Sequence, residues 1–576
     1  MKKNSFNKSL YCYLLMAIAF ALWFLSVNEV KIYRFTPDVF HYMRVLPLSY
    51  WIGLLFVLGV FSVRIIYGNN LKSTTSFDLV LILIVVLFLF GTPSFIEDTP
   101  RFLDTYGHAG STFLVKLSGK TGPSLVEIGV PAYSYPLNYP GFFTLLATLL
   151  TVTELPWMAV LKYYPLALMA IISLFIYAIA RTFNSRFSLI APVFFLSMAW
   201  FQAFHVSPES FGLILYLAIW LCMTKLFVAS KKIAVRLPLS LVIVLTVASI
   251  VTSHMVTLIF LIINLGLLSA LIYKQKLVKS YMLPRNIPEI LMIASLLFFA
   301  WLSYVAQFSF TFTVKSVSQA AANILTGAAP SLKPTIWSYE YTIVNRLREA
   351  EVLVTNILGV VSALLLFRNR SNRKIAVWLG GWLVSCWIFA FYCLFSQGAY
   401  IERPAMFGLI PVSVLISFCT QYIKRGYLRK AFMITCILMV SFGSLSLPLV
   451  RNANDYFETP SKSSLLAANF AVSNANTSVA YAGPNKSLLG LYSNLNLTEE
   501  RHYYFFHEET SIQKYDVILF DEQAYAYALN YGYETRYQRA QDFANRILPR
   551  IYDGEAAQIY MNIFWSLNVT EQMEKP

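Results

Sequence analysis

Long apolar runs recur through this sequence from the N-terminus to about residue 449. Each run holds about seventeen or more residues, enough for a helix to cross the hydrocarbon core of a bilayer. With 57% hydrophobic and only 13% charged residues, the chain cannot be an ordinary soluble protein. The sequence therefore predicts a polytopic α-helical membrane protein.

We predict about thirteen transmembrane helices, at 9–27, 49–67, 77–93, 163–181, 188–204, 209–229, 237–252, 255–273, 288–307, 352–368, 375–395, 404–422 and 430–449. No small-residue cleavage site follows the first run, so we interpret it as a retained span rather than a signal peptide. All six cysteines lie inside apolar runs with no CxxC pair, which excludes a disulfide framework and a cysteine metal site.

The charge distribution predicts the orientation. With the N-terminus inside, the inner side of the membrane holds the basic clusters 231–236, 368–374 and 424–430. The whole inner side then carries only two carboxylates, Asp78 and Glu289. The positive-inside rule favours this arrangement. We therefore predict an integral protein of the plasma membrane with its N-terminus in the cytoplasm. The net charge of +16 is then a topological signal whose partner is anionic membrane lipid, and nucleic acid is not implied.

The apolar segment 142–155 is too short for a full span, and counting it as one would invert every later loop. We expect it to be a re-entrant or interfacial helix at the outer surface.

A polar loop at 93–141 interrupts the apolar blocks and gathers ionisable residues just past a span end: Glu97, Asp98, Arg101, Asp104 and His108. Ionisable groups in such a place are usually functional, so the loop predicts an active site. A second outer loop is expected at 308–351, with Arg346 and Arg348 as weaker candidates to fold over a ligand.

The composition changes at residue 450, which divides a transmembrane domain at 1–449 from a predicted extracytoplasmic α/β domain at 450–576. TSVAYAG, YDVILFDE and AQIYMN have the pattern of strands, whereas SKSSLLAANFAVSN and ETRYQRAQDFANRIL have that of helices. The tail also holds four N-x-S/T sequons, at Asn476, Asn485, Asn496 and Asn568.

The early acidic loop, the many spans and the α/β tail together resemble the GT-C superfamily of integral-membrane glycosyltransferases. These enzymes use sugars linked to a polyprenyl phosphate, such as dolichyl phosphate. They include the protein O-mannosyltransferases and the aminoarabinose transferases. The stretches TPRFLDTYGH at 99–108 and NYPG at 138–141 are most similar to archaeal and bacterial members. The WWDYG signature of oligosaccharyltransferases is missing, since no two tryptophans are adjacent.

That resemblance implies a base in the acidic motif. An inverting transfer needs one carboxylate to accept the proton of the acceptor, while the phosphate is already a good leaving group. Asp104, four residues before His108, is the first choice as catalytic base, and Glu97-Asp98 is the second. The alternative is that these carboxylates solvate the loop and that Asp104 N-caps a helix running towards Leu117.

The donor phosphate calls for positive charge, preferably from arginine. Candidates are Arg101, His108 and Arg403; Arg101 could instead pair with Glu97, and Arg403 could lie at headgroup depth without binding donor. His205, Glu209 and His254 are candidates for the cavity rim, with a structural role as the alternative.

We assign no cofactor and no metal ligand. A divalent metal bound by Asp104 and His108 stays an open alternative. The predicted partners are a polyprenyl-phosphate sugar and a lipid, glycan or protein acceptor. The rival functions are a transporter, a lipid flippase or a polysaccharide polymerase. Transporters place ionisable groups near the bilayer midplane and show paired repeats, neither of which is evident here.

Overall fold

The computed structural model describes residues 2–561 apart from 33–37, 68–74, 129, 131–133, 184–185, 229–232, 279–285, 328–341, 396–401, 424–425, 454–458, 475–477, 482–501, 505–516, 522–533, 548–549 and 554–556. The four sequons and part of the predicted outer loop 308–351 lie outside the described residues.

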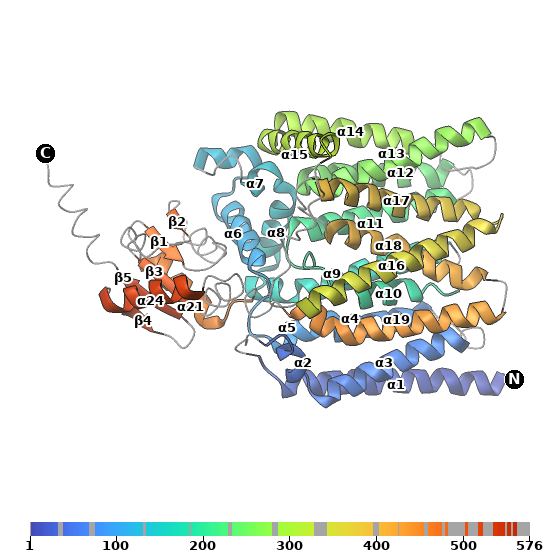
Figure 1. Cartoon of the computed structure of the whole chain (residues 1–576), viewed down its shortest axis with the longest axis horizontal. Coiled ribbons are helices and arrows are strands. Elements are labelled where there is room, and N and C mark those ends of the chain that lie inside the picture. The colour runs from blue at the N-terminus through green and yellow to red at the C-terminus, as the bar shows by residue number, and fades with distance from the viewer. Residues whose placement is uncertain are drawn as a thin grey trace.

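A bundle of long apolar helices makes up most of the chain (Figure 1). Within the described residues, twelve helical spans are long and apolar enough to cross a membrane. They are α1 (Lys2–Glu29), α3 (Leu48–Tyr67), α4 (Thr75–Val86) with its continuation through the π-turn η1 (Leu87–Gly91) into α5 (Thr92–Ile96), α9 (Trp157–Thr182), α11 (Pro208–Val228), α12 (Ile233–Ser253), α13 (Met255–Val278), α14 (Ile287–Tyr304), α16 (Thr342–Arg368), α17 (Arg373–Phe395), α18 (Glu402–Tyr422) and α19 (Gly426–Asn452). The predicted polytopic helical membrane protein is confirmed.

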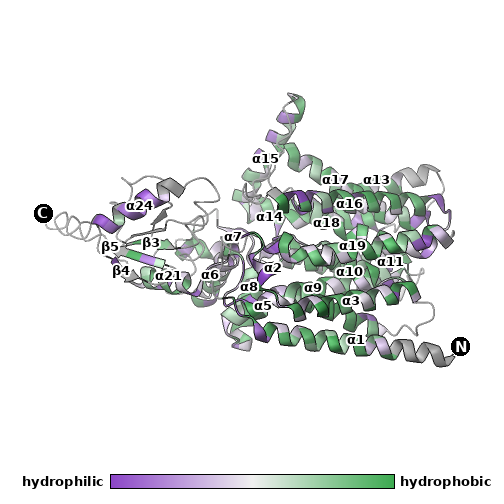
Figure 2. Ribbon diagram, turned by 60° about the horizontal axis from the view of Figure 1, so that its bottom comes forward, coloured by the Kyte–Doolittle hydropathy of each residue, from purple (hydrophilic) through white to green (hydrophobic). Residues whose placement is uncertain are grey.

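Hydrophobic residues follow the helices along their length, and hydrophilic residues gather towards the helix ends (Figure 2). A helix satisfies all its backbone hydrogen bonds internally, which is why apolar runs of this length fold as helices in lipid.

The segment predicted as a span at 188–204 is only partly helical. Its helix α10 (Ile190–Met198) has nine residues, which at about 1.5 Å per residue covers roughly half of a bilayer core. Because α9 and α11 begin side by side, with Tyr164 Oη 2.9 Å from Ser210 Oγ, the chain must return along the bundle between them. Residues 199–204 make the rest of that return without helix, and most of them are buried inside the protein, where irregular backbone is tolerated at membrane depth.

One end of the bundle carries the short helices α2 (His41–Val45), α6 (Leu103–Ser118), η2 (Gly122–Ile128), α7 (Tyr135–Asn138) and α8 (Pro140–Thr153), together with the longer α15 (Gln307–Leu325). We call this end the loop end. The N-terminus lies at the opposite end, and the C-terminal sheet lies beyond α6 at the loop end (Figure 1). With fourteen residues, α8 is shorter than the spans, as expected for 142–155.

The C-terminal part is a five-stranded sheet in the order β2-β1-β3-β5-β4, accompanied by two helices. Its elements are α21 (Lys462–Asn474), β1 (Ser478–Tyr481), β2 (His502–Tyr504), β3 (Val517–Asp521), α24 (Glu534–Ile547), β4 (Arg550–Asp553) and β5 (Ala557–Met561). Strand β1 runs parallel to β2 and β3, whereas β5 is antiparallel to β3 and β4. The three predicted strands and two predicted helices are all present; the division into domains at residue 450 stays a prediction, and α19 continues to Asn452.

Candidate active site

The chain between α5 and α6 is held on two sides at the loop end. Ile32 forms a parallel β-bridge with Glu97, with Ile32 N–H donating to Ile96 O at 2.6 Å and Asp98 N–H donating to Ile32 O at 3.3 Å. Thr99 Oγ1 donates to Pro460 O at 2.6 Å, at the start of the C-terminal part. The acidic loop is therefore tied both to the connection after α1 and to the connection after α19.

Glu97 and Arg101 form a buried ion pair within this loop. The Arg101 guanidinium donates to both Glu97 carboxylate oxygens and to Asn452 Oδ1, and its carbon lies 5.0 Å from the centre of the Tyr42 ring. Burial raises the pKa of the Glu97 carboxyl, and the Arg101 charge opposes that rise. Of the two predicted roles of Arg101, the ion pair is the one formed here.

Asp98 lies apart from this pair. Its side chain is exposed, and it interacts electrostatically with Lys162 near the start of α9. The second-choice carboxylate thus faces solvent beside a lysine.

Asp104 occupies the first turn of α6 and is exposed. The N-cap is Phe102, not Asp104, and no side-chain cap bond forms, so the predicted capping role is wrong. Phe102 has φ 63°, a region that non-glycine residues seldom adopt and that is enriched at functional sites. This unusual turn brings the chain from the buried ion pair to the exposed carboxylate within three residues.

His108 lies one helical turn after Asp104 and contacts a second histidine. Its ring is stacked on that of His205, with centroids 6.1 Å apart, and lies 5.9 Å from that of Phe143. Burial, followed by the neighbouring His205, lowers the pKa of His108 to about 4, while Asp104 acts in the opposite direction. His108 is therefore a neutral imidazole at physiological pH, able to donate one hydrogen bond and accept another.

His205 also has a free hydrogen-bonding position. Its Nδ1 lies 2.7 Å from Gln202 O, an acceptor, so the ring proton is assigned to Nδ1. The buried Nε2 then carries a lone pair and, among the described residues, has no hydrogen-bond partner.

An arginine and a carboxylate from two helix starts face each other beside these histidines. Arg403 Nε, at the start of α18, lies 2.7 Å from Glu209 Oε1, at the start of α11, and both side chains are mostly buried. His254 completes the cluster: burial, the Arg403 charge and His108 together hold the pKa of His254 well below its usual value.

Of the nine predicted site residues, Asp104, His108, His205, Glu209, His254 and Arg403 thus come together at the loop end, and we call this set the loop-end cluster. Glu97 and Arg101 form a separate buried pair, and Asp98 lies outside both groups, near Lys162.

Helix α7 and the NYPG stretch that leads from it into α8 form one wall of the cluster. The Tyr135 ring lies 6.5 Å from that of His108 and 6.4 Å from that of His254. At Gly141 a Cβ atom would lie 2.6 Å from Ser253 Oγ and 2.7 Å from Thr252 Oγ1. Glycine therefore lets α8 approach the end of α12 directly before His254.

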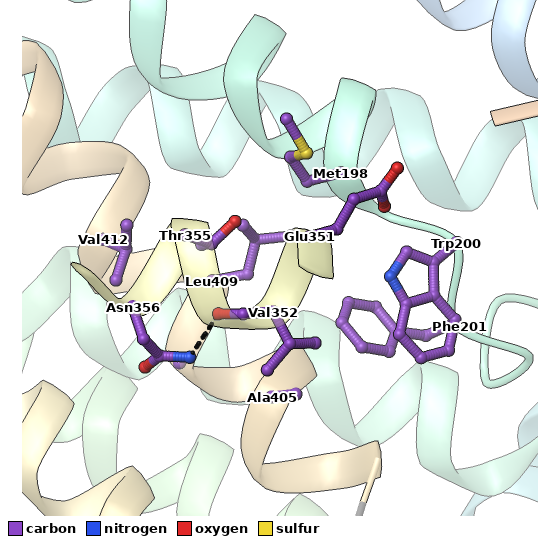
Figure 3. Close-up of a pocket in the computed structure, with 11 residues that line it drawn as sticks. Met198, Trp200, Phe201, Glu351, Val352, Thr355, Asn356, Ala405, Leu409 and Val412 are labelled. Carbon is purple, nitrogen blue, oxygen red and sulfur yellow. Dashed lines mark hydrogen bonds between the residues drawn. The ribbon is translucent and has the colours of Figure 1, made fainter. Parts of the chain in front are cut away.

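A small cavity lies deeper in the bundle, between α16, α18 and the non-helical chain after α10 (Figure 3). Its volume is about 10 Å³, enough for about one water molecule. Glu351 Oε1 accepts a hydrogen bond from Ser446 Oγ at 2.9 Å, whereas Oε2 has no hydrogen-bond partner in the described part of the chain. Sequence analysis did not single out Glu351, because one carboxylate near a span start resembles any other loop residue.

In the described part of the chain, no three His, Cys, Asp or Glu side chains lie close enough together to hold a metal ion. The Asp104–His108 pair alone supplies two of the donor types that divalent cations use.

No protein-family model and no curated protein sequence matches this chain. Among solved structures, the apo form of the Archaeoglobus fulgidus oligosaccharyltransferase matches with a TM-score of 0.50 and 11% identity, over 85% of this chain and 74% of that chain. The chain has the fold of that oligosaccharyltransferase. ArnT from Cupriavidus metallidurans, solved with undecaprenyl phosphate, matches with a TM-score of 0.49 and 11% identity, over 85% of this chain and 99% of that one.

At these identities the likeness concerns the fold alone, and it agrees with the predicted polytopic helical architecture.

Proposed function

We propose that this chain is an inverting membrane glycosyltransferase that moves a sugar from a polyprenyl phosphate to an acceptor at the loop end. The observation that carries the proposal is the loop-end cluster in a GT-C fold: an exposed carboxylate, Asp104, near a mostly buried arginine, Arg403, and three histidines. On the predicted topology this end faces outward.

Asp104 is the proposed base. It accepts the proton of the acceptor's nucleophilic group as that group bonds to the anomeric carbon of the sugar. The bond from the anomeric carbon to the phosphate oxygen breaks at the same time, and the electron pair leaves with the polyprenyl phosphate. One displacement inverts the configuration at the anomeric carbon and needs no second carboxylic acid.

Arg403 is the proposed ligand of the departing phosphate. Its guanidinium already holds one anion, the Glu209 carboxylate, at 2.7 Å, so the site is built to place a negative oxygen there. A donor phosphate would share or displace that contact as charge develops on its oxygens. His108, beside Asp104, and His205, stacked on His108, would hydrogen-bond the sugar or the phosphate.

The contacts of Arg101 and Glu97 suit phosphate binding and base catalysis less well than those of Arg403 and Asp104. Using Arg101 for phosphate would require opening its buried bonds to Glu97 and Asn452, and Glu97 would have to leave the same pair to act as a base. Asp98 is exposed and stays the alternative base. The acceptor is proposed only as a lipid, glycan or protein nucleophile.

Sugar transfer in vitro tests the proposal. Purified protein in detergent would be given a panel of radiolabelled polyprenyl-phosphate sugars with membrane extract as acceptor source, and the product's anomeric configuration read by NMR. We expect transfer with inversion from one donor. Retention would contradict the mechanism, and failure to bind any donor of the panel would favour a transporter or flippase.

A further inference from the structure

A cavity with two arginines in its lining lies at the end of the bundle opposite the loop end. It has a volume of about 630 Å³ and lies where α16 ends and α18 gives way to α19. Arg368, Asn369 and Arg370 contribute its polar wall, and Leu365, Leu366 and Leu428 contribute to its apolar wall. The cavity is therefore amphipathic, and its size is that of a site for a small organic ligand.

The two arginines are exposed and available. Neither Arg368 nor Arg370 has an ion pair or hydrogen bond among the described residues, whereas the nearby Arg373 donates to Phe367 O and stacks on the Phe367 ring at 4.9 Å. At the same end, the buried Asp78 is already paired with Arg64 at 3.1 Å. The positive charge of this cavity is thus not neutralised by the described protein.

The turn that presents the arginines is ordered by its own bonds. Asn369 Oδ1 accepts hydrogen bonds from Ser371 N at 3.3 Å and from Ser371 Oγ at 2.8 Å. The Tyr422 ring, which also lines the cavity, is fixed against Phe418 with centroids 4.5 Å apart. The cavity walls are therefore positioned before any ligand arrives.

We propose that this cavity binds one anionic glycerophospholipid of the surrounding leaflet. Its phosphate would lie between the guanidinium groups of Arg368 and Arg370, and its glycerol and upper acyl chains would lie on Leu365 and Leu428, which are 38% and 41% exposed. Basic pockets between spans are the usual recognition sites for such headgroups. The site is distant from the loop-end cluster, and the proposal does not depend on sugar transfer.

Native mass spectrometry of the full chain in detergent tests this proposal. The protein would be mixed with phosphatidylglycerol or with phosphatidylcholine and the bound lipid counted. We expect phosphatidylglycerol to be retained about thirtyfold better, the effect of two arginines near a phosphate. The double variant Arg368→Gln/Arg370→Gln should lose that preference, while Arg236→Gln, an exposed arginine at the start of α12 at the same end, should keep it.

A second variant separates the cavity from its charge. Leu428→Trp fills the apolar wall, leaves both arginines in place, and should also abolish phosphatidylglycerol retention. Equal retention of both lipids by the wild type, or unchanged retention by either cavity variant, would overturn the proposal. Displacement of the lipid by glycerol phosphate, or preferred retention of polyprenyl phosphate, would overturn the assignment to a glycerophospholipid.

Discussion

Arg403 at the start of α18 and Glu209 at the start of α11 form a mostly buried ion pair, with Nε and Oε1 2.7 Å apart. The two residues are far apart in sequence, and no local pattern links them. Their pairing places a guanidinium at the loop end, beside His254 and close to the α6 helix that carries Asp104. This contact joins the halves of the proposed active site.

Arg403→Gln should raise the KM for donor by roughly tenfold to hundredfold, because a charge-assisted hydrogen bond to the phosphate is lost. Steady-state kinetics against donor concentration measures it. The matched control is Arg44→Gln in α2, whose guanidinium pairs with Asp38 and is exposed at the same end; it should leave KM unchanged. An unaltered KM in Arg403→Gln would remove Arg403 from the donor site.

Arg101→Met should lower the free energy of unfolding by about 3–5 kcal/mol, because it leaves the Glu97 carboxylate buried without its partner. Replacing both residues with apolar ones should restore most of that stability. Thermal unfolding in detergent measures both effects. Lys120→Met, which breaks the exposed pair with Glu127, is the control and should change little. A small effect of Arg101→Met would show that the pair is solvated.

Stability should fall as the pH drops from about 6.5 towards 4, partly because of His108. The pKa of His108 is lowered to about 4 in the fold, so the unfolded chain takes up a proton in this range before the folded one does. His108→Phe keeps a ring against His205 and should flatten the decline relative to wild type. Melting curves from pH 7.5 to 4.5 provide the comparison, and parallel profiles for the two proteins would refute the assignment.

Gly141→Ala should destabilise the protein by about 1–3 kcal/mol and reduce transfer, because the new methyl group meets Ser253 Oγ and Thr252 Oγ1. The control is Gly380→Ala in α17, where a Cβ atom would have nothing within 4 Å. Thermal unfolding and transfer would be measured on both. Equal behaviour of the two variants would mean that α8 can move away from α12 at no cost.

Much of the fold follows from the sequence because a membrane helix needs only apolar length. The same criterion failed at 188–204, because an apolar run that is buried inside the protein has the same composition as one that faces lipid. The non-helical backbone at 199–204 is tolerated because the surrounding helices bury it. The strands β2 and β4, of three and four residues, were not predicted.

The candidate site divides in the same way. Asp104 and His108 are four residues apart, and their proximity was predicted from that spacing. The pair of Glu97 with Arg101 was one of the two predicted roles of Arg101. Two contacts depend on how helices distant in sequence pack: the pair of Arg403 with Glu209 and the stack of His108 on His205. Sequence analysis could therefore identify these residues as candidates but could not predict which of them are in contact.

The most direct test of the account is a single-turnover transfer experiment that compares the wild type with Asp104→Asn and Asp98→Asn. Both carboxylates are exposed, so both variants should fold, which equal melting temperatures would verify. The account predicts that Asp104→Asn slows sugar transfer by roughly a hundredfold to ten-thousandfold while donor binding is kept, and that Asp98→Asn stays close to wild type. Full activity of Asp104→Asn, with loss in Asp98→Asn, would contradict it and move the base to Asp98.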